Sequence, residues 1–275
     1  AHDTAGFTYN GEVVEFEGWA RDRIADLAIQ YMAEQRDQPF FLYLPFPTPH
    51  LPARAPEEYI EKYLAKGCGK TLAKYYAMVD HLDVNIGRIL DAVDELGLRE
   101  NTVVLFLSDN GPTGRGQTDD EFAERNPEGW RGSKGGIYEN GVRSPFSVRW
   151  PGVTEAGETP VIGHVTDLFP TLAKIAGVSL DKHKDPLDGH DLTPVFRGAA
   201  SEDLLDRFVY NAAIVPNWEG KAGYTDYLPD RNLLEYDRQA ATVRRGNYKM
   251  IKQGADYLLY DLEADPGETT DVADA

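Results

Sequence analysis

The order of three apolar segments constrains the fold of this chain most. Residues 40–44 (FFLYL) and 102–107 (TVVLFL) are short apolar runs with the length and the aromatic or β-branched content of buried strands. Between them, residues 70–97 carry apolar side chains three and four positions apart, which predicts a long amphipathic helix that stops at Gly97. A strand, a helix and a strand in this order predict a βαβ unit with both strands parallel in one sheet.

The remaining pattern predicts a second, smaller region. Helices are expected near 15–36, 56–64 and 166–176, a third strand at 146–150, and a long loop over 109–141. After about residue 200 the pattern changes to short strands, with Gly246-Asn247 placed as a hairpin turn between 242–245 and 248–252, and 257–262 as the next strand. The predicted domains are therefore an α/β core over 1–200 and an antiparallel subdomain over 201–275.

Composition excludes several classes of protein. The 28 Lys and Arg residues against 46 Asp and Glu residues give a net charge of −18, which disfavours a nucleic-acid partner. No apolar run approaches the ~20 residues of a membrane span. Cys68 is the only cysteine, so no internal disulfide can form.

Candidate site residues follow the predicted strands. Ligands of open α/β sheets bind at the carboxyl ends of the strands. The strand at 40–44 leads to His50, the strand at 102–107 leads to Asp109 and Asn110, and a Gly-rich loop carries Lys134 between Arg131 and Arg143. We therefore expect these side chains to converge at one edge of the sheet.

Each candidate has a chemical role and an ordinary alternative. Asp109 and Asn110 offer hard oxygen ligands for Ca²⁺, although a shell of 6–8 oxygens needs more than two residues, and Asp-Asn-Gly is also common turn chemistry. His50, in a proline-rich loop, could donate a proton or simply bind a backbone group. Lys134 could neutralise an oxyanion or remain a solvated charge.

Other features are discounted. Gly67–Thr71 resembles the end of a phosphate-binding loop, but Leu64 stands where that motif needs glycine. The acidic residues Asp261, Glu263, Asp265 and Glu268 are predicted to be a solvated surface run.

Six segments of the chain resemble the sulfatase family of the alkaline-phosphatase-like superfamily. They are Pro39–Pro52, Tyr75–Gly87, Asn101–Gly111 (NTVVLFLSDNG), Gly132–Pro145 (GSKGGIYENGVRSP), Val165–Gly177 and Tyr257–Glu268 (YLLYDLEADPGE). The resemblance implies an alkaline-phosphatase-like α/β sandwich with a mainly parallel central sheet and a small C-terminal antiparallel sheet. Asn140 departs from the family, which usually has a second glycine there, so a small shift of its loop is expected.

The resemblance also implies roles for individual residues. Asp109 and Asn110 match two calcium ligands, Lys134 matches the lysine that contacts the sulfate oxygens, and His50 matches the histidine that contacts the sulfate or assists the leaving oxygen. His50 and Lys134 are thus expected to be both catalytic and substrate-binding, with Ca²⁺ as the cofactor.

Three family motifs have no match in the sequence. The family nucleophile is a formylglycine made from a Cys/Ser-x-Pro-x-Arg motif, and Cys68 is followed by Gly-Lys-Thr-Leu instead. The paired aspartates of the calcium site and a Gly-Lys-x-His run are also absent. The chain therefore resembles the later part of a sulfatase, with the N-terminal part of the same protein as an expected partner, and the usual final helix is missing too.

The predicted function is hydrolysis of a sulfate monoester on a small molecule or glycan, with a carbohydrate preferred. The alternatives are a phosphoester or phosphonate ester hydrolase of the same superfamily, and a non-catalytic sulfatase-like fragment. Substrate recognition is expected in the loops 114–129 and 217–236; the second carries four aromatic residues that could face a sugar or only pack. The family suggests a periplasmic, secreted or lysosomal location, which the sequence itself does not specify.

Overall fold

Two units make up the chain, and each is described separately. The computed structural model describes residues 7–213, 240–253 and 255–274. The first unit runs up to Thr102 and includes Gly116–Glu121, and the second contains Val103–Arg115 and the chain from Phe122 onwards. The boundary predicted at residue 200 does not coincide with this division and stays a prediction.

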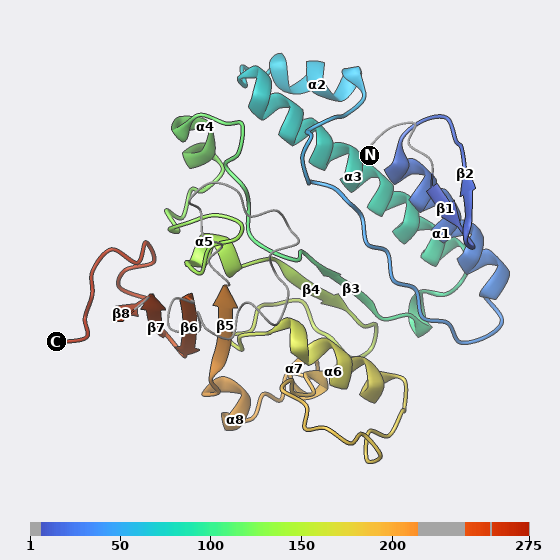
Figure 1. The fold of residues 1–275 in the computed structure, drawn as a ribbon. Helices are drawn as coiled ribbons and strands as arrows, with labels where there is room; N and C mark the ends of the chain where they lie inside the picture. Colours follow the sequence, from blue (N-terminus) through green and yellow to red (C-terminus); the bar gives the residue numbers. More distant parts are fainter. Residues whose placement is uncertain (1–6, 214–239, 254, 275) are drawn as a thin grey trace. The chain divides into compact units, whose positions relative to one another are not determined.

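Helices and one hairpin build the first unit (Figure 1). Its elements are β1 (Phe7–Tyr9), β2 (Glu12–Val14), α1 (Ala20–Gln35), α2 (Glu57–Leu64), α3 (Lys70–Glu95) and the 3₁₀ helix η1 (Arg99–Asn101). The three helices predicted here from the sequence are confirmed. Just beyond α3, Gly97 has φ of 72°, the left-handed conformation that ends many helices.

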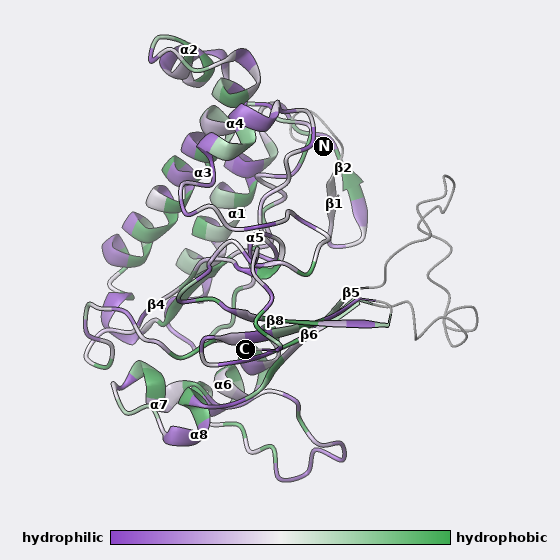
Figure 2. Cartoon of the chain, turned by 90° about the vertical axis from the view of Figure 1, so that its left-hand side faces the viewer, coloured by the Kyte–Doolittle hydropathy of each residue, from purple (hydrophilic) through white to green (hydrophobic). Residues whose placement is uncertain are grey.

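The core of the first unit lies between α1 and α3. Both helices alternate apolar and polar stretches along their length, as Figure 2 shows. Met32 of α1 and Val93 of α3 are each 2% exposed and belong to one cluster, together with small alanines that let the two helices approach closely. This packing follows directly from the amphipathic pattern in the sequence.

Residues 40–44 lie against this core, but they do not form the predicted strand. Their side chains alternate: Phe40, Leu42 and Leu44 pack on the α1–α3 cluster, whereas Phe41 is 71% and Tyr43 is 74% exposed. No described residue pairs with this segment in a sheet. The apolar pattern therefore predicted that part of this segment is buried, which is confirmed. It also predicted a strand, which is wrong, because a strand needs a hydrogen-bonded neighbour as well as apolar side chains.

The second unit combines sheets with short helices. Its elements are β3 (Val104–Leu107), α4 (Asp119–Glu124, whose first residues belong to the first unit), α5 (Glu139–Val142), β4 (Phe146–Arg149), η2 (Val165–Asp167), α6 (Leu168–Ile175), α7 (Thr193–Phe196), α8 (Glu202–Leu205), β5 (Val209–Ala213), β6 (Ala240–Arg245), β7 (Tyr248–Gln253) and β8 (Asp256–Asp261). The predicted helix at 166–176 and strand at 146–150 are confirmed within a residue or two. The region 109–141 is mostly loop but contains α4 and α5.

The predicted parallel sheet is not found in the described residues. β3 pairs with β4 in antiparallel fashion, with Leu105 opposite Val148. All strand pairs that the structure describes are antiparallel. The βαβ prediction is not confirmed, because it requires a strand at residues 40–44 and the structure has none there.

The small C-terminal antiparallel sheet is confirmed. Its strand order is β5-β6-β7-β8, and β6 and β7 form the predicted hairpin with Gly246 at φ of 57° (Figure 1). Ile251 and Tyr260 fill the centre of its buried face, at 0% and 3% exposure. The loop predicted over 217–236, with its four aromatic residues, lies outside the described residues.

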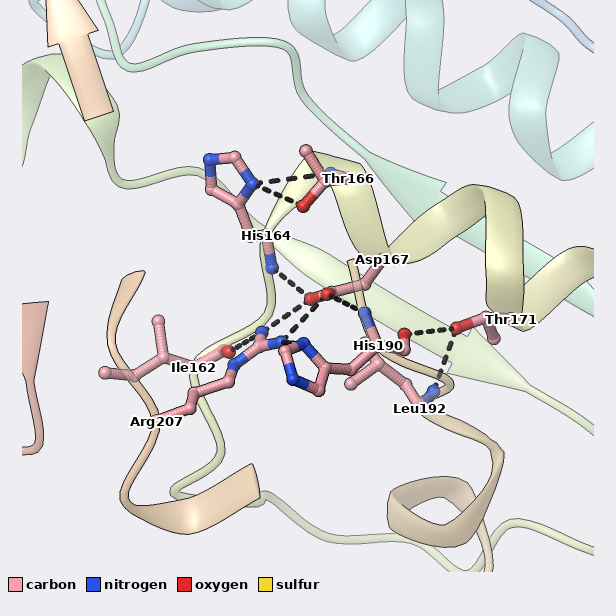
Figure 3. A network of polar contacts seen from close by, with 8 residues as sticks. All are labelled: Ile162, His164, Thr166, Asp167, Thr171, His190, Leu192 and Arg207. Carbon is pink, nitrogen blue, oxygen red and sulfur yellow. Dashed lines mark hydrogen bonds and ion pairs between the residues drawn. The ribbon is translucent and has the colours of Figure 1, made fainter. Parts of the chain in front are cut away.

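A buried ion pair between Asp167 and Arg207, with hydrogen bonds from two backbone amides, connects three segments of the second unit (Figure 3). Arg207 donates to both carboxylate oxygens of Asp167, at 2.8 and 2.5 Å, and the backbone amides of His164 and His190 donate to the same carboxylate. Burial alone would raise the pKa of Asp167, but the hydrogen bonds from Arg207 and the two amides outweigh it and lower that pKa. The charged pair therefore links η2, directly before α6, to the chain before β5.

Among the helices in the described part of the chain, none has the length and apolar character that crossing a membrane requires.

Candidate active site

Asp109 and Asn110 directly follow β3, as the sequence predicted. The Asp109 carboxylate is exposed, and no hydrogen bond or ion pair involves it within the described residues. The Asn110 side-chain amide donates to Gly111 O at 2.8 Å, which leaves its Oδ1 free to accept or to ligate. A carboxylate and an amide oxygen therefore stand side by side at the end of a strand.

These two residues fit a calcium ion as part of a ligand set. Both oxygens are hard ligands of the kind that Ca²⁺ prefers, and neither is engaged by a neighbouring cation. Within residues 7–213, 240–253 and 255–274, no group of three or more Asp, Glu, His or Cys side chains could hold a metal. The further ligands that a calcium shell requires would therefore come from other groups.

Lys134 lies on a loop, residues 131–143, that is bound to the loop after β3. We call residues 131–143 the Lys134 loop. The backbone amide of Lys134 donates to Pro112 O at 2.8 Å, and Gly111 N donates to Gly141 O at 3.0 Å. The backbones of the loop after β3 and of the Lys134 loop are therefore hydrogen-bonded to each other, and the roles of Lys134, Asp109 and Asn110 stay predictions.

Glycine makes this close approach possible. A Cβ on Gly111 would stand 1.9 Å from Asn140 O, and a Cβ on Gly141 would stand 2.6 Å from the carbonyl oxygens of Ser133 and Gly136. Only glycine leaves room for backbone at such distances. Asn140, where the family usually has glycine, is 3% exposed and donates its amide to Gly132 O at 3.0 Å. It therefore helps to close the Lys134 loop, while the expected shift of that loop stays a prediction.

Lys134 differs from the two arginines beside it. The guanidinium of Arg131 donates to Glu268 O and lies 4.0 Å from the centre of the Tyr138 ring. That of Arg143 lies 4.4 Å from the centre of the Trp130 ring and 3.7 Å from Glu139. The exposed Lys134 side chain has no partner in the described part of the protein, so its ammonium group remains available for an anion.

His50 lies in the first unit, on an exposed loop. Its Nδ1 is 2.8 Å from Leu51 O, and because a carbonyl can only accept, Nδ1 carries the proton. The other ring nitrogen, Nε2, is left for external chemistry. The buried Arg21 holds this loop on both sides, since it donates to Thr48 Oγ1 at 3.3 Å and to Arg54 O at 2.7 Å.

The convergence of His50 with the other three residues stays a prediction, because His50 belongs to a different unit. The buried residue that contacts the Lys134 loop was not identified from the sequence. Glu268 was predicted to be solvated, but it is 0% exposed and contacts the loop directly. The usable signal was its position in Tyr257–Glu268, a segment already singled out by its resemblance to the family.

Comparison with known proteins adds an independent line of evidence. A family model described as Sulfatase matches residues 4–178. Arylsulfatase A of Homo sapiens is 30% identical over 94% of this chain and 48% of its own length. A sulfatase of Formosa agariphila is 31% identical over 91% of this chain and 45% of its own. The chain thus spans about half the length of these curated relatives.

Solved structures share the fold. The crystal structure of Ps i-CgsB has a TM-score of 0.78 at 24% identity and covers 96% of this chain and 53% of its own. BT4656, in complex with its substrate D-glucosamine-2-N,6-O-disulfate, has a TM-score of 0.58 at 17% identity, covering 98% and 68%. A phosphonate monoester hydrolase of Agrobacterium radiobacter has a TM-score of 0.68 at 24% identity, covering 94% and 58%. At these identities the likeness establishes the fold alone.

Proposed function

The chain belongs to the sulfatase family, and on this premise we propose that it supplies part of the active site of an enzyme that hydrolyses a sulfate monoester. The observation that carries the proposal is the pairing of the two loops after β3 and before β4. It supports the proposal because one of these loops carries the exposed Lys134 and the other carries Asp109 and Asn110.

We propose that Lys134 binds the oxygens of the sulfate group. Sulfate ester cleavage, like phosphoryl transfer, depends mainly on positioning and on stabilising negative charge. The backbone of Lys134 is held by its hydrogen bond to Pro112 O, and its ammonium group has no partner in the described residues. This group can therefore bind the negatively charged sulfate oxygens without first breaking an ion pair. Arg131 and Arg143 cannot, because their guanidinium groups are already engaged.

We propose that His50 donates a proton to the leaving oxygen and that Asp109 and Asn110 are calcium ligands. With Nδ1 bound to Leu51 O, the Nε2 atom of a protonated His50 can donate to the departing alcohol. Asp109 and Asn110 would contribute two ligands of the Ca²⁺ site. When bound, the ion would supply positive charge beside the sulfate oxygens.

The nucleophile is proposed to come from outside this sequence. The 275 residues contain no Cys/Ser-x-Pro-x-Arg motif, and the chain spans about half of its curated relatives. Nucleophile knockouts in other hydrolases reduce turnover by about 10⁶-fold. The assay therefore requires the full-length protein that contains this sequence.

Replacing Lys134 in that full-length protein tests the proposal. We expect Lys134→Ala to lower the rate of sulfate release by about 10²–10³-fold, the usual effect of losing one charge-stabilising group. Lys182→Ala, an exposed lysine elsewhere, is the matched control and should keep full activity. Unchanged turnover in Lys134→Ala would exclude this role. Chelation should also reduce turnover, with recovery on adding Ca²⁺.

The preferred substrate is a sulfated carbohydrate. Two proteins of the same fold support this choice, because their structures contain a neocarrahexaose and a glucosamine disulfate. Sulfate release from sulfated saccharides, compared with release from a simple aryl sulfate, measures the preference. A higher kcat/KM on the aryl ester would contradict it.

A phosphonate or phosphate ester is the second candidate substrate. It is favoured by the likeness in fold to the phosphonate monoester hydrolase. Sulfate, phosphate and phosphonate esters of one alcohol, assayed in parallel, separate the two functions by the ratio of their kcat/KM values. If no ester is cleaved by the full-length protein, the remaining alternative of a non-catalytic sulfatase-like chain is supported.

A further inference from the structure

A cluster of charged side chains, three of them buried, packs against the Lys134 loop. Lys249 of β7 is 1% exposed, and its ammonium lies 3.0 Å from Glu139 Oε1 and 2.8 Å from Glu268 Oε1. Glu139 and Glu268 are 3% and 0% exposed. Two more cations lie near Glu139 Oε2, Arg244 of β6 at 3.0 Å and Arg143 at 3.7 Å. Burying so many charges is costly, and replacing such clusters by apolar residues is often neutral or stabilising. Stability alone is thus a weak reason for the cluster.

The cluster is attached to both ends of the segment that carries Lys134. At the far end, Glu139 N donates to Glu268 Oε2 at 2.7 Å. At the near end, Arg131 Nη1 donates to Glu268 O at 2.9 Å. The ends are also joined to each other, because Asn140 N donates to Arg131 O at 2.9 Å. Glu268 therefore binds both ends of this segment, Glu139 through its carboxylate and Arg131 through its backbone carbonyl.

The backbone of Glu268 has an unusual conformation. Its φ is 52°, in the left-handed region that residues other than glycine rarely adopt. This conformation accompanies the double contact, with the carbonyl on Arg131 and the carboxylate between Glu139 N and Lys249. Strained backbone of this kind often marks functional positions.

Apolar packing fixes the same loop against the C-terminal sheet. Ile137, 5% exposed, inserts beside Ile251 and Tyr260 in the sheet core. Lys134 itself lies at the exposed side of the loop. Its position is therefore determined by the loop backbone, because its side chain has no partner in the described residues.

We propose that Lys249, through Glu139 and Glu268, is a positioning residue that sets the place of the Lys134 ammonium group for sulfate ester hydrolysis. This inference rests on the proposed function. Lys249 is 1% exposed, and the two carboxylates that it contacts belong to Glu139 of the loop and to Glu268, so we expect it to act through the loop. A misplacement of about 1 Å at a reacting centre can reduce a rate by about 10²-fold. The C-terminal sheet is thus part of the catalytic apparatus through its support of Lys134.

A double-mutant cycle in the full-length protein tests the proposal. Lys249→Met should lower kcat/KM by about tenfold to a hundredfold when Lys134 is present. In the Lys134→Ala background the same change should have no further effect, because there is no ammonium group left to position. Equal losses in both backgrounds, or no loss in the wild type, would overturn the proposal.

Two further variants separate positioning from loss of folding. Lys249→Met removes the cation that the two buried carboxylates share, so Glu268→Gln, which removes one of these carboxylates, enters the same cycle with the same expected result. Asp167→Asn breaks a different buried ion pair of the same unit and should lower the melting temperature while keeping kcat/KM within about twofold below that temperature. A comparable loss of kcat/KM in Asp167→Asn would show that any destabilisation reduces activity and would refute a specific role for Lys249.

The two proposals fail in different ways. If Lys134→Ala retains full turnover, the role of Lys134 is wrong, and nothing remains for Lys249 to position. If Lys134→Ala loses turnover and Lys249→Met adds an independent loss, the proposed function stands and the positioning inference alone is wrong.

Discussion

Replacing Gly111 by alanine probes the contact on which the candidate site depends. The new Cβ would lie 1.9 Å from Asn140 O, 2.7 Å from Asn140 C and 3.2 Å from Gly141 C. All three are backbone atoms, so no side-chain rotation can relieve the overlap. Since Cβ atoms keep about 3.0 Å from such neighbours, the two loops must separate by about 1 Å.

The magnitude follows from what this separation breaks. Overpacking a well-packed site costs about 1–3 kcal/mol. The hydrogen bond from Gly111 N to Gly141 O contributes about 1 kcal/mol more. We therefore expect Gly111→Ala to lower the free energy of unfolding by about 2–4 kcal/mol. At about 2–4 °C per kcal/mol, the melting temperature should fall by roughly 4–16 °C.

Thermal unfolding, followed by circular dichroism, measures this change. Gly157→Ala is the matched control, because its Cβ would meet nothing within 4 Å and its φ is not in the left-handed region. The control should change the free energy of unfolding by less than about 0.5 kcal/mol. If Gly111→Ala behaves like Gly157→Ala, the close approach of the two loops does not exist in solution.

Two further predictions concern stability. The pKa of Asp167 is lowered in the folded state, so its carboxylate contributes stability that is present above the unfolded pKa of about 4 and is lost as pH falls through the lowered value. Denaturant titrations across acidic pH should show this loss for the wild type, and a flatter profile for Asp167→Asn, which is also expected to cost about 3–5 kcal/mol at neutral pH; an identical slope in both proteins would contradict the assignment. Gly87 lies inside α3, and a Cβ there would meet nothing within 4 Å, so Gly87→Ala should raise the free energy of unfolding by about 0.5–1 kcal/mol. A lower melting temperature of Gly87→Ala would show that the helix packs more tightly at this position than the structure indicates.

Local elements were largely predictable from the sequence. The helix α3 follows from its apolar stripe and Gly97, and the β6–β7 hairpin follows from Gly246-Asn247. These signals lie within a few residues of the structure they specify, so periodicity and turn chemistry reveal them. Residues 40–44 show where such local signals are insufficient, because the sequence of a segment does not specify whether another strand pairs with it.

The candidate site was predicted in part. Lys134, Asp109 and Asn110 were identified from strand ends and from family resemblance, and the structure joins their two loops. Glu268 was wrongly predicted to be a solvated acid; its place in Tyr257–Glu268 indicated a family segment, but not that Lys249, nineteen residues earlier, is buried beside it. Contacts between distant residues of this kind depend on how the sheet packs against the loop.

From the amino-acid sequence alone we could predict the family, the helices α1, α2, α3 and α6, the C-terminal hairpin and the chemical types available at the site. Three features became visible only in the folded protein: the antiparallel pairing of β3 with β4, the backbone contact of two loops at Gly111 and Gly141, and the burial of Glu268 against the Lys134 loop. The physical reason is that propensity and periodicity act between near neighbours along the chain. Strand pairing, close backbone approach and the burial of charge are settled only by which distant segments meet in the folded protein.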